Sequence, residues 1–189
     1  NTANWNDGSV FKSGNDSTLR FCNGNDDWTN GDVNITNNVP GALTARNFVL
    51  QGRADVENTK VTVGTPATTL TLTANSDVGD TAEIQLNGYQ SSDGHKLTYE
   101  VAMNIDLKSN LRFQNNSDSY YANNIFTGII GESTPGRTVT KNDASEVTLT
   151  GVNIYTGATI IHGGTLALGA SGSIASSVSV ALMPGAVFK

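Results

Sequence analysis

Apolar and polar residues alternate along much of the chain, which is the pattern of half-buried β-strands. The clearest example is KLTYEVAMNIDL at residues 96–107, where every second residue from Leu97 to Leu107 is apolar. This segment is predicted to form one half-buried strand, or two strands joined by a bend. Shorter stretches show the same alternation: LRF (19–21), NFVLQG (47–52), KVTVG (60–64), TLTLT (69–73), AEIQLNG (82–88) and NLRFQNN (110–116).

Clusters of turn-forming residues separate these stretches. Asn-Gly and Asp-Gly pairs suit positions with positive φ, and Pro-Gly suits tight turns. No window of 11 residues has the 3.6-residue apolar period of a helix, so we expect an all-β chain with almost no helix. The turn clusters are NGNDDWTNGD (23–32), NNVPG (37–41), ANSDVGD (74–80), SSDGH (91–95) and NNSDS (115–119).

An internal repeat is visible toward the C-terminus. Aligning EVTLTG (146–151), GTLALG (164–169) and GAVFK (185–189) brings Leu149, Leu168 and Phe188 into one column, with spacings of 19 and 20 residues. A fixed period of this length predicts a coil that returns to the same place once per rung. Stacked parallel strands would then rise about 4.8 Å per rung.

Two further pairs of residues can be compared with this period. Ile161 and Val180 lie 19 residues apart and are predicted to form a second inward column. Leu50 and Leu72 are spaced slightly more widely, which indicates a period that loosens toward the N-terminus. The prediction is a β-solenoid with rungs of about 20 residues.

The composition fits stacked rungs. The chain has 189 residues, of which 15% are charged, and it holds 22 Asn and 23 Thr; residues 147–188 contain no Asp, Glu, Lys or Arg. Like charges stacked on neighbouring strands repel, whereas Thr, Ser and Asn can stack on copies of themselves and still be hydrated. Solubility is therefore expected to come from hydroxyl and amide groups.

Charge and cysteine content exclude several classes of protein. The net charge of −6 argues against a nucleic-acid partner and against a polybasic membrane anchor. We find no apolar run of about 20 residues, so this segment is not expected to insert into a membrane. Cys22 is the single cysteine, which rules out an intramolecular disulfide. Because the sequence begins at Asn1 without a leader, we expect a processed product or a piece of a longer protein.

The segment NIYTGATIIHGGTLALGASGSIASSVSVALMPGAVF (153–188) resembles the autotransporter-associated β-strand repeat. Residues 147–151 fill the place of its Leu-Thr-Leu-Thr-Gly element, residues 153–157 its Asn-Thr-Tyr-Thr-Gly element, and residues 172–188 its Gly-Ser-Ile and Gly-Ala-x-Phe elements. The departures are Ile154 for the usual Thr, His162 in the turn, and Met183-Pro184 before the last Gly.

The resemblance implies a right-handed parallel β-helix in a bacterial protein that is extracellular or displayed on the outer membrane. Residues 1–40 are predicted to be an Asn/Asp-rich N-terminal cap or the first rungs. Residues 41–189 are predicted to be the β-helix, with its clearest repeat at 146–189.

A polysaccharide-cleaving enzyme would need two or three acids converging on one face. Glu83, Glu100 and Asp106 occupy outward strand positions, while Asp77 and Asp80 lie in a turn. Glu100 and Asp106 would be about 20 Å apart along an extended strand, too far for a catalytic pair unless the strand bends. The prediction is that the chain has no catalytic residues and requires no cofactor.

Other candidate sites are a cation site, an aromatic surface and two histidines. Asp26, Asp27 and Asp32 could supply hard oxygen ligands to Ca²⁺, with a solvated loop as the alternative. Trp5, Trp28, Tyr120 and Tyr121 could stack on sugar rings; for the two Trp residues we favour a plug at the end of the coil. His95 and His162 are interpreted as solvated turn residues rather than metal ligands.

The interpretation that follows is a non-catalytic structural or adhesive β-helix segment that serves as a stalk, spacer or passenger. A fibre subunit is an alternative, because Ala186 and Phe188 belong to a strand on which a further rung of the parent chain, or another copy, could stack. An enzyme or a binding module that acts on surface glycans is the third alternative.

Overall fold

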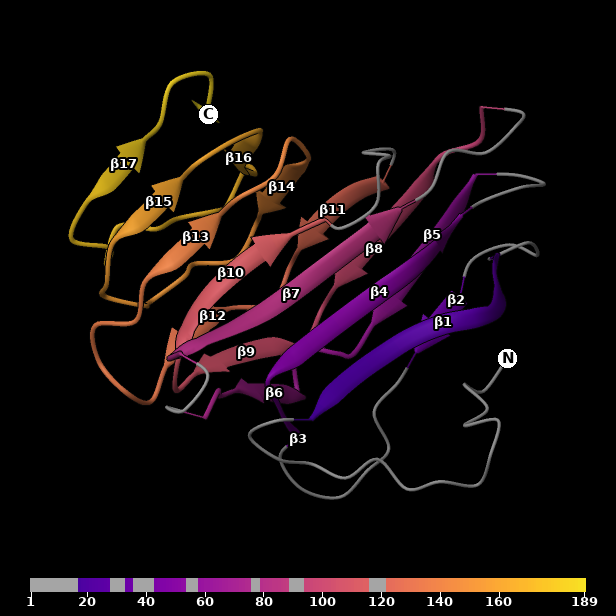
Figure 1. Ribbon diagram of the computed structural model, residues 1–189, viewed down its shortest axis with the longest axis horizontal. Coiled ribbons are helices and arrows are strands. Elements are labelled where there is room, and N and C mark those ends of the chain that lie inside the picture. Colours follow the sequence, from indigo (N-terminus) through magenta and orange to yellow (C-terminus); the bar gives the residue numbers. More distant parts are fainter. Residues whose placement is uncertain are drawn as a thin grey trace.

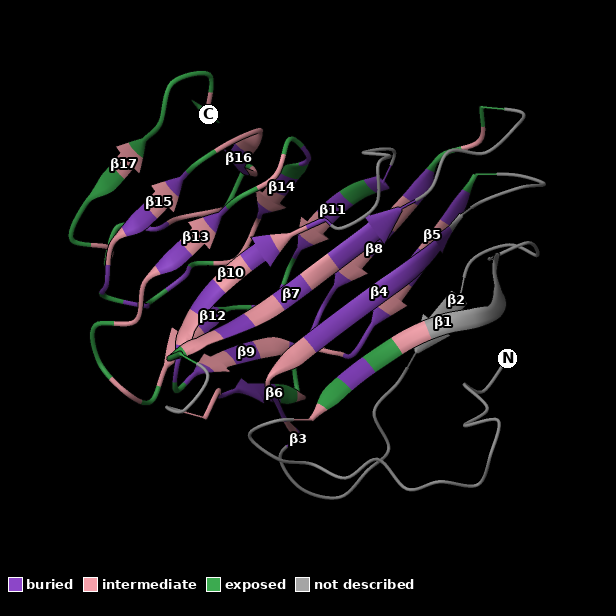
Figure 2. Cartoon of the chain, viewed as in Figure 1, coloured by how far each residue is buried: buried purple, intermediate pink, exposed green. Residues whose placement is uncertain are grey.

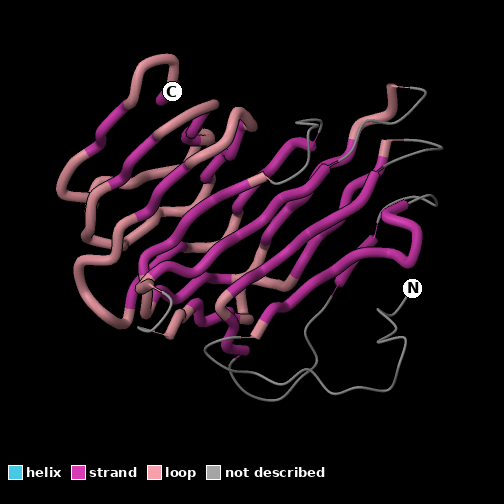
Figure 3. Tube along the Cα trace, viewed as in Figure 1, coloured by secondary structure: helices cyan, strands magenta, loops and turns pink. Residues whose placement is uncertain are grey.

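The computed structural model describes residues 17–27, 33–35, 43–53, 58–75, 79–88, 94–115 and 122–189. For residues 22–27, 33–35 and 53 it describes the backbone alone. Every named element is a β-strand, and no helix occurs within these ranges (Figure 3). The predicted all-β class is thereby confirmed for the described part of the chain.

The strands form three parallel sheets, here called A, B and C, and the chain visits them in that order (Figure 1). Sheet A contains β1 (Thr18–Asp27), β4 (Asn47–Arg53), β7 (Thr81–Gly88), β10 (Asn110–Gln114), β13 (Val139–Lys141), β15 (Thr159–Ile161) and β17 (Val180–Leu182). Sheet B contains β2 (Val33–Ile35), β5 (Thr59–Val63), β8 (Leu97–Val101), β11 (Ala122–Phe126), β14 (Glu146–Leu149), β16 (Thr165–Leu168) and β18 (Val187–Phe188). Sheet C contains β3 (Leu43–Ala45), β6 (Thr69–Leu72), β9 (Asn104–Leu107) and β12 (Ile130–Glu132).

Each pass through the sheets is one rung of a parallel β-helix. Every described strand pairs in parallel with a strand that lies one full turn away in sequence. In the two rungs that follow β12, the third side is reduced to an isolated parallel bridge between Val152 and Ser173. The predicted β-solenoid is confirmed, and the segment 96–107 forms two strands with a bend at residues 102–103.

Rung length is short at the C-terminus and longer upstream. Near the C-terminus, Glu146 pairs with Thr165, and Thr165 pairs in turn with Val187. Upstream, Thr59 pairs with Leu97, so that the chain between these two partners is almost twice as long. Only the C-terminal rungs come close to the predicted length, because the upstream rungs carry long connections between their strands.

The pairing corrects the predicted relation between Leu50 and Leu72. Leu50 pairs with Leu86, and Leu72 pairs with Leu107. Leu50 and Leu72 therefore belong to different sheets, A and C, and the distance between them in the sequence does not report a period. Because the upstream rungs are long, two leucines on different sheets of the same rung can lie about one predicted period apart in the sequence.

The last rung also differs from the prediction. Leu149 does pair with Leu168, but Phe188 pairs with Leu166. Ile161 pairs with Leu182 rather than with Val180. The reason is length, because the connection from sheet B to sheet A grows from residues 150–158 to residues 169–179, and the connection from sheet A to sheet B grows from residues 162–164 to residues 183–186. That longer connection is a turn in which Ala186 N–H donates to the Met183 carbonyl.

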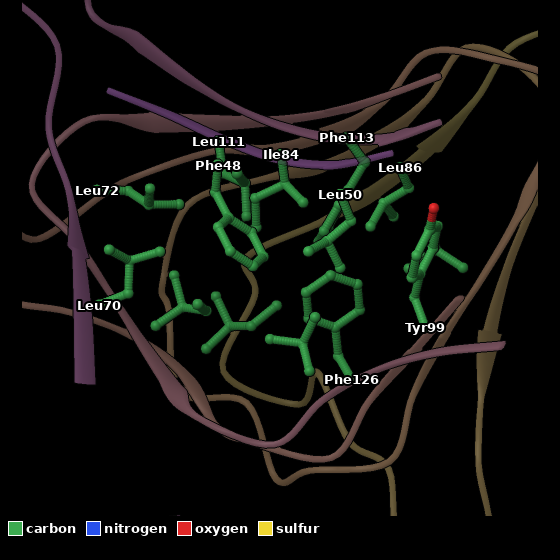
Figure 4. Close-up of a cluster of buried hydrophobic side chains, with 14 of the residues drawn as sticks. Phe48, Leu50, Leu70, Leu72, Ile84, Leu86, Tyr99, Leu111, Phe113 and Phe126 are labelled. Carbon is green, nitrogen blue, oxygen red and sulfur yellow. The ribbon is translucent and has the colours of Figure 1, made fainter. Parts of the chain in front are cut away.

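The core fills the inside of the coil with side chains from all three sheets (Figure 4). In sheet A the register stacks Phe48 on Ile84 and Ile84 on Phe113. Phe113 meets Phe126 of sheet B edge to face, with ring centroids 5.1 Å apart. Since each rung is open above and below, the neighbouring rungs cover its apolar side chains on those two sides.

Glycine is required where the chain turns from sheet B toward sheet C. A Cβ atom at Gly128 would lie 2.0 Å from the Met103 carbonyl oxygen, and one at Gly151 would lie 2.5 Å from the Gly128 carbonyl oxygen. Both contacts are with main chain that cannot move without breaking the stack. The glycines at this corner thus permit the close approach of successive rungs.

Removing an inward side chain should destabilise the coil, whereas truncating an outward one should not. Leu149 is fully buried, so Leu149→Ala is expected to lower the free energy of unfolding by about 2–5 kcal/mol. Val187, on the outer face of sheet B, is 46% exposed, and Val187→Ala should change it by less than about 0.5 kcal/mol. Urea unfolding followed by circular dichroism measures both; equal effects would contradict the inward assignment of Leu149.

Candidate functional site

The three acids considered for catalysis lie on three different sheets. Glu83 is in β7 of sheet A and forms an ion pair with Arg112, its direct partner in the next rung. Glu100 is in β8 of sheet B and forms an ion pair with Lys60 of the rung below. Both carboxylates therefore have a cation beside them on their own sheet.

Asp106 lies in β9 of sheet C, beyond the bend at residues 102–103 that follows Glu100. This bend is the one that would have been needed to bring the two acids together, but it places them on different sheets. Asp106 Oδ2 instead accepts a hydrogen bond from Ser133 Oγ at 3.0 Å. Glu83, Glu100 and Asp106 thus do not share a face of the coil, as catalytic acids acting on one bond must.

Most of the predicted cation and sugar-binding residues lie outside the described residues. This holds for Asp32, Trp5, Trp28, Tyr120 and Tyr121, and also for Asp77. Asp26 and Asp27 belong to β1, of which only the backbone is described at these positions. Within the described ranges, no group of three or more His, Cys, Asp or Glu residues is placed to hold a metal ion.

The two histidines lie three rungs apart, both between a strand of sheet A and the next strand of sheet B. His95 is half-buried just before β8, and His162 is exposed after β15. Three rungs correspond to about 15 Å, which is beyond the reach of a shared ligand. The histidines therefore form no joint site.

Ala186 and Phe188 in the last rung are half-buried and pack against the core. Around them the apolar side chains are more exposed than elsewhere: Val180, Leu182, Met183 and Val187 are between 39% and 48% exposed (Figure 2). Val180 and Leu182 continue the inward columns of Thr159 and Ile161. Stacking of a further copy on this rung stays a prediction.

Lys141 is a buried cation that the sequence pattern does not reveal. It occupies an inward position of β13, between Phe113 in the rung below and Ile161 in the rung above. Its side chain is 1% exposed. Val139 and Lys141 alternate as two inward residues would, but a lysine is normally assigned to the surface, so alternation alone does not predict its burial.

The Lys141 ammonium is held by the turn that follows its own strand. Nζ donates to the Asp143 carbonyl oxygen at 2.6 Å and to Asp143 Oδ1 at 2.8 Å. The same Oδ1 accepts from Ser145 N–H at 2.7 Å. Burial lowers the pKa of Lys141, and the Asp143 carboxylate opposes that shift. The pair fixes the corner between sheets A and B in this rung.

Glu132 links two rungs through its carboxylate, at the corner after sheet C. Oε1 accepts from the Thr156 backbone N–H at 3.0 Å and from Thr156 Oγ1 at 2.5 Å. Arg137 N–H donates to Oε2 at 2.8 Å, and Gly136 N–H donates to Oε1 at 3.2 Å. Burial alone would raise the pKa of Glu132, but these hydrogen bonds, led by that from Thr156, outweigh it and lower the pKa.

A chain of hydroxyl groups lies inside the C-terminal rungs. Tyr155 OH is 2.8 Å from Thr159 Oγ1, which is 3.0 Å from Ser177 Oγ of the next rung. Ser177 Oγ also donates to the Gly157 carbonyl oxygen. Burial raises the pKa of Tyr155 to about 12, against the opposing hydrogen bond to Thr159. The hydroxyls satisfy one another, which is a packing role rather than a reactive one.

Comparison with known protein families gives one match, and it falls on the rungs just described. Residues 139–168 match the passenger-associated-transport-repeat. The repeat spans β13, β14, β15 and β16, one full rung and the first two strands of the next. It includes Lys141, Asp143 and Tyr155, so the buried polar groups of this region belong to the repeat itself. The suspected autotransporter-type repeat is thus confirmed for this part of the chain.

Searches of curated proteins and of solved structures found no match. Within the described residues, no helix has the length and apolar character needed to cross a membrane. The match to the repeat is therefore the comparison on which a functional proposal can rest.

Replacing Lys141 alone should be costly, and replacing both members of the pair should not. Lys141→Met leaves Asp143 buried without its cation and is expected to lower the free energy of unfolding by about 3–5 kcal/mol. In Lys141→Met/Asp143→Asn, the methionine fits the apolar column and the amide can still accept from Ser145 N–H. The double variant should lie within about 1 kcal/mol of the parent. A double variant as unstable as the single one in urea unfolding would show that the ion pair is itself required.

The hydrogen bonds that the Glu132 carboxylate accepts predict a loss of stability in acid. Because its folded-state pKa lies below the unfolded value of about 4.5, the carboxylate contributes stability above that pH and loses it as the pH falls through the folded-state pKa. The drop in the free energy of unfolding from pH 7 to pH 3 should be smaller in Glu132→Gln than in the parent. Glu146→Gln, which removes an exposed ion pair with Lys189, is the matched control and should behave like the parent. An identical acid response of Glu132→Gln and the parent would contradict the assignment.

Proposed function

We propose that the chain is a non-catalytic passenger segment of a secreted or surface-displayed bacterial protein, in which it acts as a stiff stalk or adhesive spacer. The observation that carries this proposal is the match of residues 139–168 to the passenger-associated-transport-repeat, set within a continuous parallel coil. Parallel ladders that run through successive rungs give a rod whose length grows with each repeat. Such a rod can hold an attached module away from a cell surface.

The distribution of acids supports a structural rather than an enzymatic role. Glu83, Glu100 and Asp106 point away from three separate sheets, and each is neutralised or hydrogen-bonded on its own sheet. A glycosidase or lyase would instead hold its acids within one groove, at separations of about 5–9.5 Å for hydrolysis. The acids of this region stabilise contacts between rungs.

Incubation with a panel of bacterial and host polysaccharides tests the absence of catalysis. We expect neither new reducing ends nor unsaturated products. Activity that persists in a Glu83→Gln/Glu100→Gln/Asp106→Asn variant would point to acids elsewhere in the chain, and activity lost in Glu100→Gln or Asp106→Asn would place the site on these residues. Either result would overturn the proposal.

The spacer role is tested by changing the length of the coil. Duplicating one rung, residues 151–171, should add about 4.8 Å to the longest dimension measured by small-angle scattering. Cooperative unfolding should be retained. A duplicated rung that loops out without lengthening the particle would contradict a role based on stacked rungs.

A further inference from the structure

The third side of the coil changes its construction after β12. Up to this strand, successive rungs pair here through a main-chain ladder, in which Leu107 is the partner of Glu132. Sheet C has no further strand in the described residues. Ile130 N–H instead donates to the side-chain oxygen of Asn153 at 2.9 Å, next to a main-chain bond from Ile154 N–H to the Ile130 carbonyl oxygen. Sheets A and B, by contrast, continue their ladders through β13 and β14.

The carboxylate of Glu132 closes this side at the point where the ladder has ended. It accepts hydrogen bonds from the N–H and the hydroxyl group of Thr156 in the rung above. It also accepts from the N–H groups of Gly136 and Arg137, in the turn that leads back to sheet A. Gly136 N–H lies in addition 3.1 Å from Thr156 Oγ1. One side chain therefore joins two rungs and the turn between them.

The charged groups around Glu132 come from the rungs below and from its own turn. The rung above supplies none, because residues 147–188 contain no Asp, Glu, Lys or Arg. Arg137 is paired with Asp80, and Asp106 accepts from the Ser133 hydroxyl group. No ion pair between Glu132 and a cation occurs in the described part of the chain, so hydrogen bonds hold its charge. The nearby charged side chains are Asp80, Asp106, Lys108 and Arg137.

We propose that Glu132 is an acid-operated hinge, whose protonation opens the third side of the coil between residues 130–137 and 152–158. Each carboxylate oxygen faces at least one N–H donor, so a proton on either oxygen sets two donors against each other. The ladders of sheets A and B contain no group that titrates with Glu132 and keep the two rungs together. Opening on one side of three bends the coil without separating its rungs.

The hinge is closed at neutral pH and opens in acid. Burial raises the pKa of Glu132 and the hydrogen bonds lower it, the one from the Thr156 side chain most, and the net result is a lowered pKa. The closed form is therefore favoured above the unfolded value of about 4.5 and is lost as the pH falls through the folded-state pKa. This goes beyond the stalk function, since a stalk with continuous ladders needs no joint.

Amide hydrogen exchange followed by NMR between pH 7 and pH 3 tests the hinge. The informative amides are those of Ile130 and Ile154, which bond across the third side without contacting Glu132. At pH 7, Glu132→Gln should lower their protection factors about tenfold, and the parent should show the same loss only in acid. The amides of Asn142 and Thr150, which bond across sheets A and B, should keep their protection in both proteins.

Thr156→Val tests the titration while leaving the carboxylate in place. The valine has the shape of threonine but removes the hydroxyl bond that lowers the pKa of Glu132 most among the hydrogen bonds. Acid opening should therefore begin at a higher pH in Thr156→Val than in the parent. An unchanged midpoint would contradict the hinge. This variant also serves as the second test should Glu132→Gln fail to fold.

The other acids near the turn provide the controls. Asp80→Asn and Asp106→Asn should open at the same pH as the parent, and opening at pH 7 in either would assign the hinge to that acid instead. Loss of protection confined to the amides of Gly136, Arg137 and Thr156 would show a local contact and overturn the hinge. Simultaneous loss across all three sides would overturn it as well. Each of these results leaves the stalk proposal standing, because that proposal rests on the length of the coil at neutral pH.

Discussion

The structure depends on register between successive rungs. Each inward side chain is covered above and below by the residues one turn earlier and one turn later, so the main-chain ladders decide which side chains stack. Phe48, Ile84 and Phe113 stack in this way in sheet A, with Lys141 and Ile161 above them. Any change of connection length moves a whole column, as the longer connections before β17 and β18 move the partner of Phe188 from Leu168 to Leu166.

The same stacking governs where charge is tolerated. In the N-terminal rungs, outward acids alternate with cations along a sheet, as Glu83 does with Arg112, so that neighbours about 4.8 Å apart attract. In the C-terminal rungs, apart from the exposed ion pair of Glu146 with Lys189, the outward strand positions carry mainly hydroxyl and aliphatic groups. Lys141 and Asp143 form a pair of opposite charges in the interior, at the start of the repeat. Pairing opposite charges and using uncharged side chains both avoid like charges in adjacent rungs.

The sequence predicts the strands and the stacked coil well, because alternation and turn residues are local signals. It predicts the columns less well, since the pairing of Leu50 with Leu86 crosses a connection whose length no local pattern reports. The burial of Lys141 escapes sequence reasoning because it depends on an acid in the following turn and on apolar neighbours in other rungs. The hydrogen bond from Thr156 to Glu132 joins residues 24 positions apart, and alternation carries no signal for such a contact.

Register also explains why Glu83, Glu100 and Asp106, the outward acids of the described strands considered above, do not form a cluster. Convergence on one substrate bond would need acids on the same sheet in adjacent rungs, yet the partner of Glu83 is Arg112, and the next residue above Asp106 is Gly131. The positions that would complete a site are used to hold rungs together or to let them approach. Among the outward residues of the repeat, Val152 and Ile154 are large apolar side chains that stay more than half exposed.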